Sequence, residues 1–160
     1  VQGLNNGKDM VGNKLDGSTA FTIGAAVTPE ADLVGPVLAK FEVKVKAGAQ
    51  FFQTQAVYHP DVFASFMKQA RPFNVKVLAG ILVLRNYKMA EFMNANIPGM
   101  SVPSEMIDEL KAAGEKAEDV GVDIAVRTIK AVRPHCDGVH IMAIKATHRL
   151  AEIITKAELN

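Results

Sequence analysis

The chain has 160 residues, of which 49% are hydrophobic and 22% charged, a composition typical of a soluble globular domain that can bury one core. Its net charge of +1, from 18 basic and 17 acidic side chains, disfavours nucleic acid and anionic membranes as partners. Cys136 is the single cysteine and no apolar run approaches the roughly 18 residues of a membrane span, so we expect no internal disulfide, no membrane span and a cytoplasmic location.

The first predicted elements form one strand and one helix. The segment from Val1 to Asp9 lacks the order of a signal peptide and is typical of the exit of a helix that begins upstream. A short apolar strand is predicted over 21–26, followed by a helix over 31–47 that stops at Gly48. This pair is a first βα unit.

Two further units follow in the same order. A strand over 49–55 leads to a helix over 60–71. A third strand over 75–81, broken by Gly80, leads to a short helix over 87–94.

The remaining sequence predicts a long helical region and a last unit. Ser104 is expected to cap a helix, because its hydroxyl can accept a hydrogen bond from the first turn. The helical region extends to Val132, with Gly114 and Gly121 as breaks. The last strand and helix are predicted over 138–144 and 146–159.

This alternation predicts an α/β fold of parallel strands with covering helices. The first three strands begin at residues 21, 49 and 75, close to the roughly 31 residues per unit of a (β/α)8 TIM barrel. We interpret residues 1–160 as a single partial domain, half of such a barrel. Because a half-barrel leaves two sheet edges and one sheet face uncovered, we expect a partner, either the missing half-barrel or another copy of the chain.

Two glutamines stand at the end of the second predicted strand. Strand alternation places Gln53 and Gln55 on one face with Phe51, while Phe52 and Thr54 face the other side. One face therefore changes from apolar to amide as the strand ends. The carboxyl ends of parallel strands are where ligands bind in α/β folds, so these amides are candidate ligand groups.

Several phrases of the sequence occur in the order and spacing of a known family. They are Phe21-Thr-Ile-Gly-Ala-Ala with Pro29-Glu30, the stretch from Lys44 to Tyr58, Ala79-Gly-Ile-Leu with Asn86-Tyr87-Lys88, Ile97-Pro98, and Gly138-Val-His-Ile-Met-Ala. Together they cover nearly the whole chain, which resembles methylenetetrahydrofolate reductase, most closely the bacterial forms found in acetogens and their relatives. The resemblance implies the carboxyl-terminal half, strands five to eight, of a flavin-containing barrel.

The resemblance also implies a reaction. NADH or NADPH reduces a bound FAD or FMN, and 5,10-methylenetetrahydrofolate then takes the hydride to become 5-methyltetrahydrofolate. The family's acidic proton donor and main flavin-binding aspartate belong to the first four strands, so we expect no catalytic residue in this half. Two alternatives stay open, a non-catalytic subunit or fragment that binds folate or flavin, and a pterin-binding methyltransferase barrel.

Three residues are candidates for binding the substrate. Gln55 matches the family glutamine that hydrogen-bonds the pterin, whose ring offers a donor beside an acceptor. Tyr87 matches an aromatic position that stacks on the folate or the nicotinamide, although a tyrosine at a helix start also commonly covers a core. Gln53 is the third candidate, with a hydrogen bond from a strand end to a neighbouring loop as its alternative role.

Three residues are candidates for binding the flavin cofactor. Lys44 matches a basic residue near the ribityl and phosphate groups, and Ala26 a small residue beside the flavin. Thr28 stands where better-known members carry a tyrosine over the flavin. Asp32 and Val37 replace a histidine and an aspartate of those members, which leaves both FAD and FMN as candidates.

Structural roles are the alternative for two basic residues. Lys44 is one of several lysines that would suit a solvated helix face. His140 is placed early in the last strand, at the end of a barrel that serves stability, and is interpreted as structural. The histidines and Cys136 show no metal-ligand spacing, so no metal site is predicted.

Overall fold

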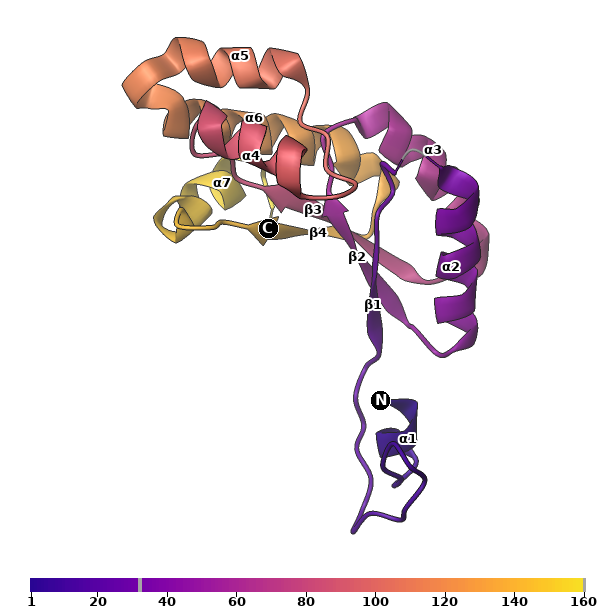
Figure 1. Cartoon of the computed structure of the whole chain (residues 1–160). Coiled ribbons are helices and arrows are strands. Elements are labelled where there is room, and N and C mark those ends of the chain that lie inside the picture. Colours follow the sequence, from indigo (N-terminus) through magenta and orange to yellow (C-terminus); the bar gives the residue numbers. More distant parts are fainter. Residues whose placement is uncertain (32, 160) are drawn as a thin grey trace.

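The computed structural model describes residues 1–31 and 33–159. Four strands form one sheet in the order β1-β2-β3-β4 (Figure 1). They are β1 (Gly24–Val27), β2 (Phe51–Ala56), β3 (Lys76–Leu82) and β4 (Gly138–Met142). All neighbouring strands are parallel, which confirms the predicted α/β sheet, and their carboxyl ends therefore lie together at one end of it.

Helices separate these strands along the chain. They are α1 (Gln2–Asn5), α2 (Val34–Lys46), α3 (Pro60–Ala70), α4 (Tyr87–Asn96), α5 (Ser104–Ala113), α6 (Ala117–Val132) and α7 (Leu150–Lys156). In Figure 1, α2, α3 and α6 lie along one side of the sheet; α5 packs against α6, and α4 packs against α5. The segment that precedes β1, with α1, projects away from the sheet. None of the helices in the described ranges is long and apolar enough to cross a membrane.

The observed elements differ from the predicted ones mainly at their ends. β1 starts at Gly24 because its pairing with β2 starts there, opposite Phe51. β3 continues through Gly80 to Leu82, so the predicted break at this glycine is wrong. The last helix is shorter than predicted, because a 3-10 turn (Thr147–Arg149) precedes α7.

Two predicted features of the long helical region are also wrong. Ser104 is the first residue of α5, and the cap position belongs to Pro103, whose side chain has no acceptor. Gly121 lies inside α6, where a β-carbon would overlap the carbonyl oxygen of Leu84, so this glycine lets the helix approach the chain just after β3. Gly114 does end α5, with a φ of 54°.

The main core lies between the sheet and helices α2, α3 and α6. Phe41 of α2 stacks on Phe52 of β2 with ring centroids 4.0 Å apart and meets Phe66 of α3 edge to face at 5.9 Å. Alternate residues of β3, such as Val77 and Ile81, complete the sheet side of this core. The apolar alternation of the strands therefore buries one face of the sheet beneath the helices.

A second core cluster lies toward the carboxyl ends of β2 and β3. Leu82 and Leu84 pack there with Leu110 of α5 and Ile124 of α6. Because α4 and α5 belong to this cluster, the long insertion between β3 and β4 covers part of the carboxyl-end region.

The opposite face of the sheet lies outside the main core and carries small, polar and aromatic residues. Gly24, Ala26, Phe51, Gln53 and His140 point away from the main core, and we call this surface the open face. Figure 1 shows no helix over this part of the described chain. The outer edges of β1 and β4 have no strand partner among the described residues.

Candidate functional site

A β-bulge interrupts the second strand near its carboxyl end. Gln53 pairs with Leu78 of β3, but Ala56 pairs with Gly80, so two residues of β2 lie opposite one residue of β3. One extra residue reverses the alternation of the strand. Consistent with this reversal, Phe52 before the bulge and Val57 after it both lie in the main core.

The two residues of the bulge, Thr54 and Gln55, are held by four hydrogen bonds. The Thr54 hydroxyl donates to the Gln55 carbonyl oxygen at 2.6 Å and accepts the backbone N–H of Gly80 at 2.8 Å. The Gln55 side-chain oxygen accepts the N–H of Ala56 at 3.1 Å. The fourth bond joins Nε2 of His140 to the Thr54 carbonyl oxygen at 2.9 Å. The candidate pterin-binding glutamine therefore lies in a locally fixed segment.

The two candidate glutamines have different surroundings. Gln53 is exposed on the open face beside Phe51, as the predicted alternation requires. Gln55 is half-buried within the bulge, so strand alternation alone does not fix the direction of its side chain.

The three candidate cofactor residues line one hollow at the carboxyl end of β1. Ala26, Thr28 and Lys44 surround a space of about 430 Å³, and the turn at Pro98 and Gly99 closes part of it. We call this the β1 hollow. The Lys44 ammonium donates to the Ala26 carbonyl oxygen at 2.6 Å, and this hydrogen bond joins helix α2 to the end of β1. The structure thus brings together residues that are distant in the sequence.

A second hollow, of about 410 Å³, lies on the open face and adjoins the first through a shared residue. Gly24, Ala26, Phe51 and Gln53 line it, and Ala26 also lines the β1 hollow. Ala26 and Gln53 are register partners on neighbouring strands. The Phe51 ring lies over Gly24, and the small Ala26 side chain and the Gln53 amide leave room beside it for a flat ligand with polar edges.

The Tyr87 ring is more enclosed than a ring that is fully free to stack on a ligand. It is the first residue of α4, which Asn86 caps by accepting the N–H of Met89 at 2.9 Å. Its ring packs half-buried against the second core cluster, and the Lys111 ammonium lies 5.5 Å from the ring centroid. The stacking role proposed for Tyr87 would use the part of the ring that these contacts leave free.

Glu30 is a site residue that the sequence reasoning missed. Its side chain is only 3% exposed, and one carboxylate oxygen accepts the backbone N–H groups of Tyr58 and His59 at 2.9 and 2.7 Å. The other oxygen lies 3.1 Å from Nδ1 of His59. Burial and the nearby Glu30 carboxylate raise the pKa of the Tyr58 hydroxyl, which is buried without a hydrogen-bond partner in the described part of the chain. Glu30 therefore joins the segment after β1 to the segment after β2.

His140 was interpreted as a structural residue at the amino end of its strand, and the structure corrects its position. It is the middle residue of β4 and lies opposite Gly80 in the register. A glycine inside a strand commonly marks the close approach of another group, so Gly80 was the residue of the sequence that could have indicated the contact made by His140.

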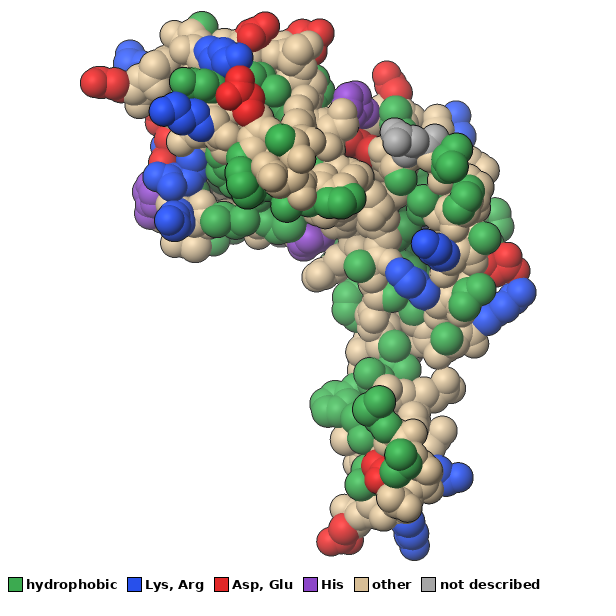
Figure 2. Space-filling view, in the orientation of Figure 1, with side chains coloured by type: hydrophobic (Ala, Val, Ile, Leu, Met, Phe, Trp, Pro, Cys, Tyr) green, Lys and Arg blue, Asp and Glu red, His purple; other side chains and the backbone are tan. Residues whose placement is uncertain are grey.

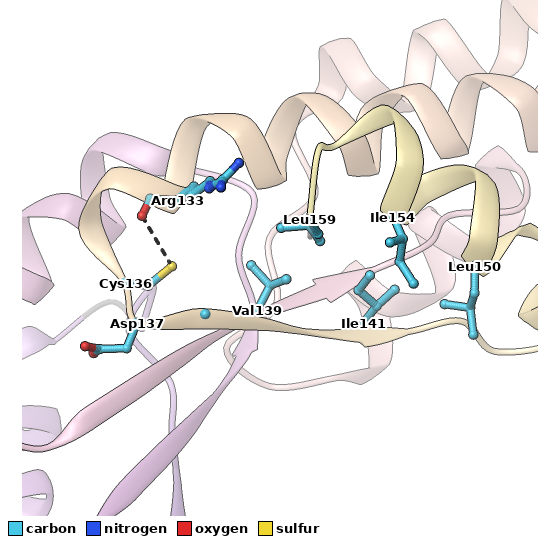
Figure 3. A pocket seen from close by; sticks show the side chains of 9 residues that line it. Arg133, Cys136, Asp137, Val139, Ile141, Leu150, Ile154 and Leu159 are labelled. Atoms are coloured by element: carbon cyan, nitrogen blue, oxygen red, sulfur yellow. Dashed lines mark hydrogen bonds between the residues drawn. The ribbon is translucent and has the colours of Figure 1, made fainter.

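A larger hollow lies elsewhere, at the outer edge of β4. It has a volume of about 720 Å³, and Figure 3 shows Val139 and Ile141 pointing from β4 toward Leu150, Ile154 and Leu159. Burial raises the pKa of the Cys136 thiol at one end of it. These apolar side chains suit packing against protein better than binding a polar substrate.

Charged side chains of both signs occur in the described part of the chain. Figure 2 shows acidic and basic side chains interspersed over this view of the molecule. Residues 1–31 and 33–159 contain no cluster of three or more His, Cys, Asp or Glu side chains placed to hold a metal ion. Asp32, one of the departures from the family pattern, lies outside the described residues.

Comparison with known proteins gives one consistent result. The sequence model of the family described as methylenetetrahydrofolate reductase matches residues 7–158. The fission yeast Schizosaccharomyces pombe has a "Methylenetetrahydrofolate reductase 2" that is 31% identical over 137 residues, which is 74% of this chain and 21% of that protein. "Methylenetetrahydrofolate reductase (NADH) 1" of Arabidopsis thaliana is 30% identical over 104 residues, 61% of this chain and 17% of the relative. The protein of the same name from Zea mays is 29% identical over 101 residues, 59% of this chain and 17% of its own length.

The chain thus spans about a fifth of the length of the curated relatives it matches. The family match covers nearly the whole chain, including all four strands and the residues around both hollows. On this evidence, the chain belongs to the methylenetetrahydrofolate reductase family.

Proposed function

We propose that this chain forms strands five to eight of a reductase barrel that converts 5,10-methylenetetrahydrofolate to 5-methyltetrahydrofolate with NADH or NADPH. The observation that carries the proposal is the parallel four-stranded sheet with helices on one face, an open opposite face and two unpaired outer edges in the described chain. A closed barrel has no free edges and fills its interior with side chains, so a second half-barrel would cover these surfaces.

The partner in this proposal is an amino-terminal half-barrel of the same fold. The relatives are about five times longer than the stretch they share with this chain, so they have enough additional sequence for a half-barrel of that kind. The apolar hollow between β4 and α7 supports the same partner, because the next strand of a barrel would run beside it (Figure 3). A second copy of the chain is the alternative occupant. With one cysteine in the sequence, we expect the assembly in the cytoplasm.

A flavin fits the surroundings of the two adjoining hollows. Ala26 presents only a methyl group to the two hollows, so a flat ring system can approach the strand backbone there, whereas the Phe51 ring already covers Gly24. Lys40 and Lys44 line the β1 hollow and supply positive charge for a phosphate group. FAD or FMN, when bound, would supply the hydride chemistry. The chain's own residues would hold the cofactor, keep water from its face and orient the substrate beside it.

The proposed substrate groups lie on β2 and at the start of α4. Gln55 would hydrogen-bond the pterin ring, because an amide can match the donors and acceptors of a heterocycle. Gln53 lies nearer the open-face hollow, where its exposed amide could meet the substrate or the cofactor. Tyr87 would pack against a flat face of the ligand. The proton donor is assigned to the amino-terminal half.

The test is to express the chain with an amino-terminal half-barrel from the same protein and to record its spectrum and both half-reactions. We expect a yellow complex whose flavin is bleached by NADH or NADPH and reoxidised by methylenetetrahydrofolate. In Gln55→Ala, reoxidation by the folate should slow more than tenfold while bleaching changes little. A colourless complex that still binds a pterin would instead favour the methyltransferase barrel. A yellow complex without turnover would favour the non-catalytic subunit.

A further inference from the structure

The imidazole of His140 reaches across a neighbouring strand. His140 lies on β4, while the oxygen that it contacts belongs to Thr54 on β2, and β3 runs between them. The Nε2–oxygen distance is 2.9 Å. A side chain that spans a whole strand spacing to reach one carbonyl oxygen is an unusual feature of a sheet, where side chains normally pack on their neighbours.

Gly80 makes this crossing possible. It is the register partner of His140, and a β-carbon at this position would lie 2.5 Å from the Thr54 oxygen and 2.9 Å from Nε2 of His140. It would also lie 2.9 Å from the Gln55 carbonyl oxygen. Any side chain at residue 80 would therefore occupy the space where the imidazole meets the bulge.

Around the bulge, side chains take the place of backbone groups as hydrogen-bond partners. The Gly80 N–H goes to the hydroxyl of Thr54, where an undisturbed parallel pair would use a backbone carbonyl. The Thr54 carbonyl is bonded by the imidazole of His140. Buried backbone groups need partners, so His140 satisfies an acceptor in a segment where the bulge disturbs the ladder.

The same arrangement fixes which end of the Gln55 amide is offered to a ligand. The Ala56 N–H needs an acceptor, and the Gln55 side-chain oxygen provides it at 3.1 Å. The side-chain NH2 group of Gln55 is then the end available to donate.

We propose that His140 is a positioning residue for Gln55: its Nε2–H bond to the Thr54 carbonyl holds the β2 bulge in the shape that presents the Gln55 NH2 group to an acceptor atom of the bound heterocycle. This inference rests on the proposed function for the identity of the ligand, but its geometry belongs to the chain itself. Because a carbonyl oxygen only accepts, Nε2 must carry the proton, which predicts the Nε2–H tautomer for the neutral imidazole.

The variants His140→Gln and His140→Asn give the sharpest test, in the complete reductase. Both carry an amide N–H2, but the asparagine is one methylene shorter and cannot reach across β3 to Thr54. We expect His140→Gln to keep the folate half-reaction within about threefold, and His140→Asn to slow it about tenfold, the effect of one lost hydrogen bond. Reduction of the flavin by the nicotinamide should change less than about twofold in both. His135→Asn, in the 3-10 turn before β4, is the matched control and should leave both half-reactions unchanged.

A second variant and a spectroscopic measurement separate this inference from the proposed function. Gly80→Ala should slow the folate half-reaction at least as much as His140→Asn does, because its β-carbon would displace both the Thr54 carbonyl oxygen and the imidazole that bonds it. In NMR spectra of the unsubstituted protein, Nε2 of His140 should be the protonated nitrogen. Amide exchange at Ala56 should be faster in His140→Asn than in His140→Gln. Equal exchange and equal folate rates in these two variants would overturn the positioning role, as would equal losses in both half-reactions. If the unsubstituted protein reduces no folate, the proposed reaction fails, and the tautomer and the exchange rates still decide the role of His140.

Discussion

Replacing Gly121 by alanine adds one methyl group where helix α6 approaches the chain just after β3. The new β-carbon would overlap the carbonyl oxygen of Leu84, which is backbone and cannot turn aside as a flexible side chain could. The helix must therefore retreat from the sheet. This movement would loosen the packing of α6 residues that are 1% exposed or less in both core clusters, such as Val122 and Ile124.

Two opposing effects set the magnitude. Alanine is favoured over glycine inside a helix by about 1 kcal/mol. Overpacking that forces a backbone shift costs about 1 to 3 kcal/mol and sometimes more, and an overlap with a backbone oxygen belongs at the upper end of that range. We therefore expect Gly121→Ala to lower the free energy of unfolding by about 1 to 2 kcal/mol, or the melting temperature by roughly 2 to 8 °C for a unit of this size.

Urea denaturation followed by circular dichroism measures this change, with Gly35→Ala as the matched control. Gly35 lies in α2 with no atom within 4 Å of its would-be β-carbon, so the same substitution there should be neutral or stabilising by up to about 1 kcal/mol. If Gly121→Ala proved as stable as the unsubstituted protein, the close approach of α6 to Leu84 would be refuted.

Three further substitutions test the carboxyl-end region and the opposite end of the sheet. Tyr58→Phe removes a buried hydroxyl that has no hydrogen-bond partner in the described chain, so the free energy of unfolding should stay equal or rise by about 1 kcal/mol. A clear loss of stability in chemical denaturation would show that the hydroxyl has a partner. Glu30→Gln should cost about 2 kcal/mol, because the carboxylate accepts two backbone N–H groups and faces His59, and hydrogen exchange after β2 should become faster. Burial raises the pKa of Asp137, but the Val77 N–H and two cations outweigh it and hold that pKa below its usual range. Its stabilisation should therefore be complete above about pH 4 and be lost as the pH falls through the lowered value, and Asp137→Asn should remove this acid dependence in pH-resolved denaturation.

The fold could be predicted largely because strands and helices bury apolar residues with different periods. The βα order, the parallel sheet and the helix end at Gly114 follow from such local patterns and turn residues. Gly80 and Gly121 were taken for breaks because a local pattern cannot distinguish a chain break from a close approach. In each case the reason for glycine is an atom far away in the sequence, the Thr54 or the Leu84 carbonyl oxygen.

The candidate site was predictable only in part. The phrase around Gln55 predicted the second strand, and the family resemblance selected Ala26, Thr28 and Lys44, which line one hollow. The β2 bulge could not be foreseen, because it depends on pairing with β3 rather than on the residues of β2 alone. His140 was passed over for the same reason, since its contact lies two strands away.

The hydrogen bond from Lys44 to the Ala26 carbonyl oxygen links the joining of the two half-barrels to anion binding in the β1 hollow. That oxygen lies on the edge strand β1, and any strand that extended the sheet there would compete with the ammonium for it. Displaced from the oxygen, the ammonium would face the β1 hollow with its charge unshared. Joining of the two half-barrels and affinity for an anion in that hollow would then be thermodynamically linked, so each would strengthen the other by the same factor.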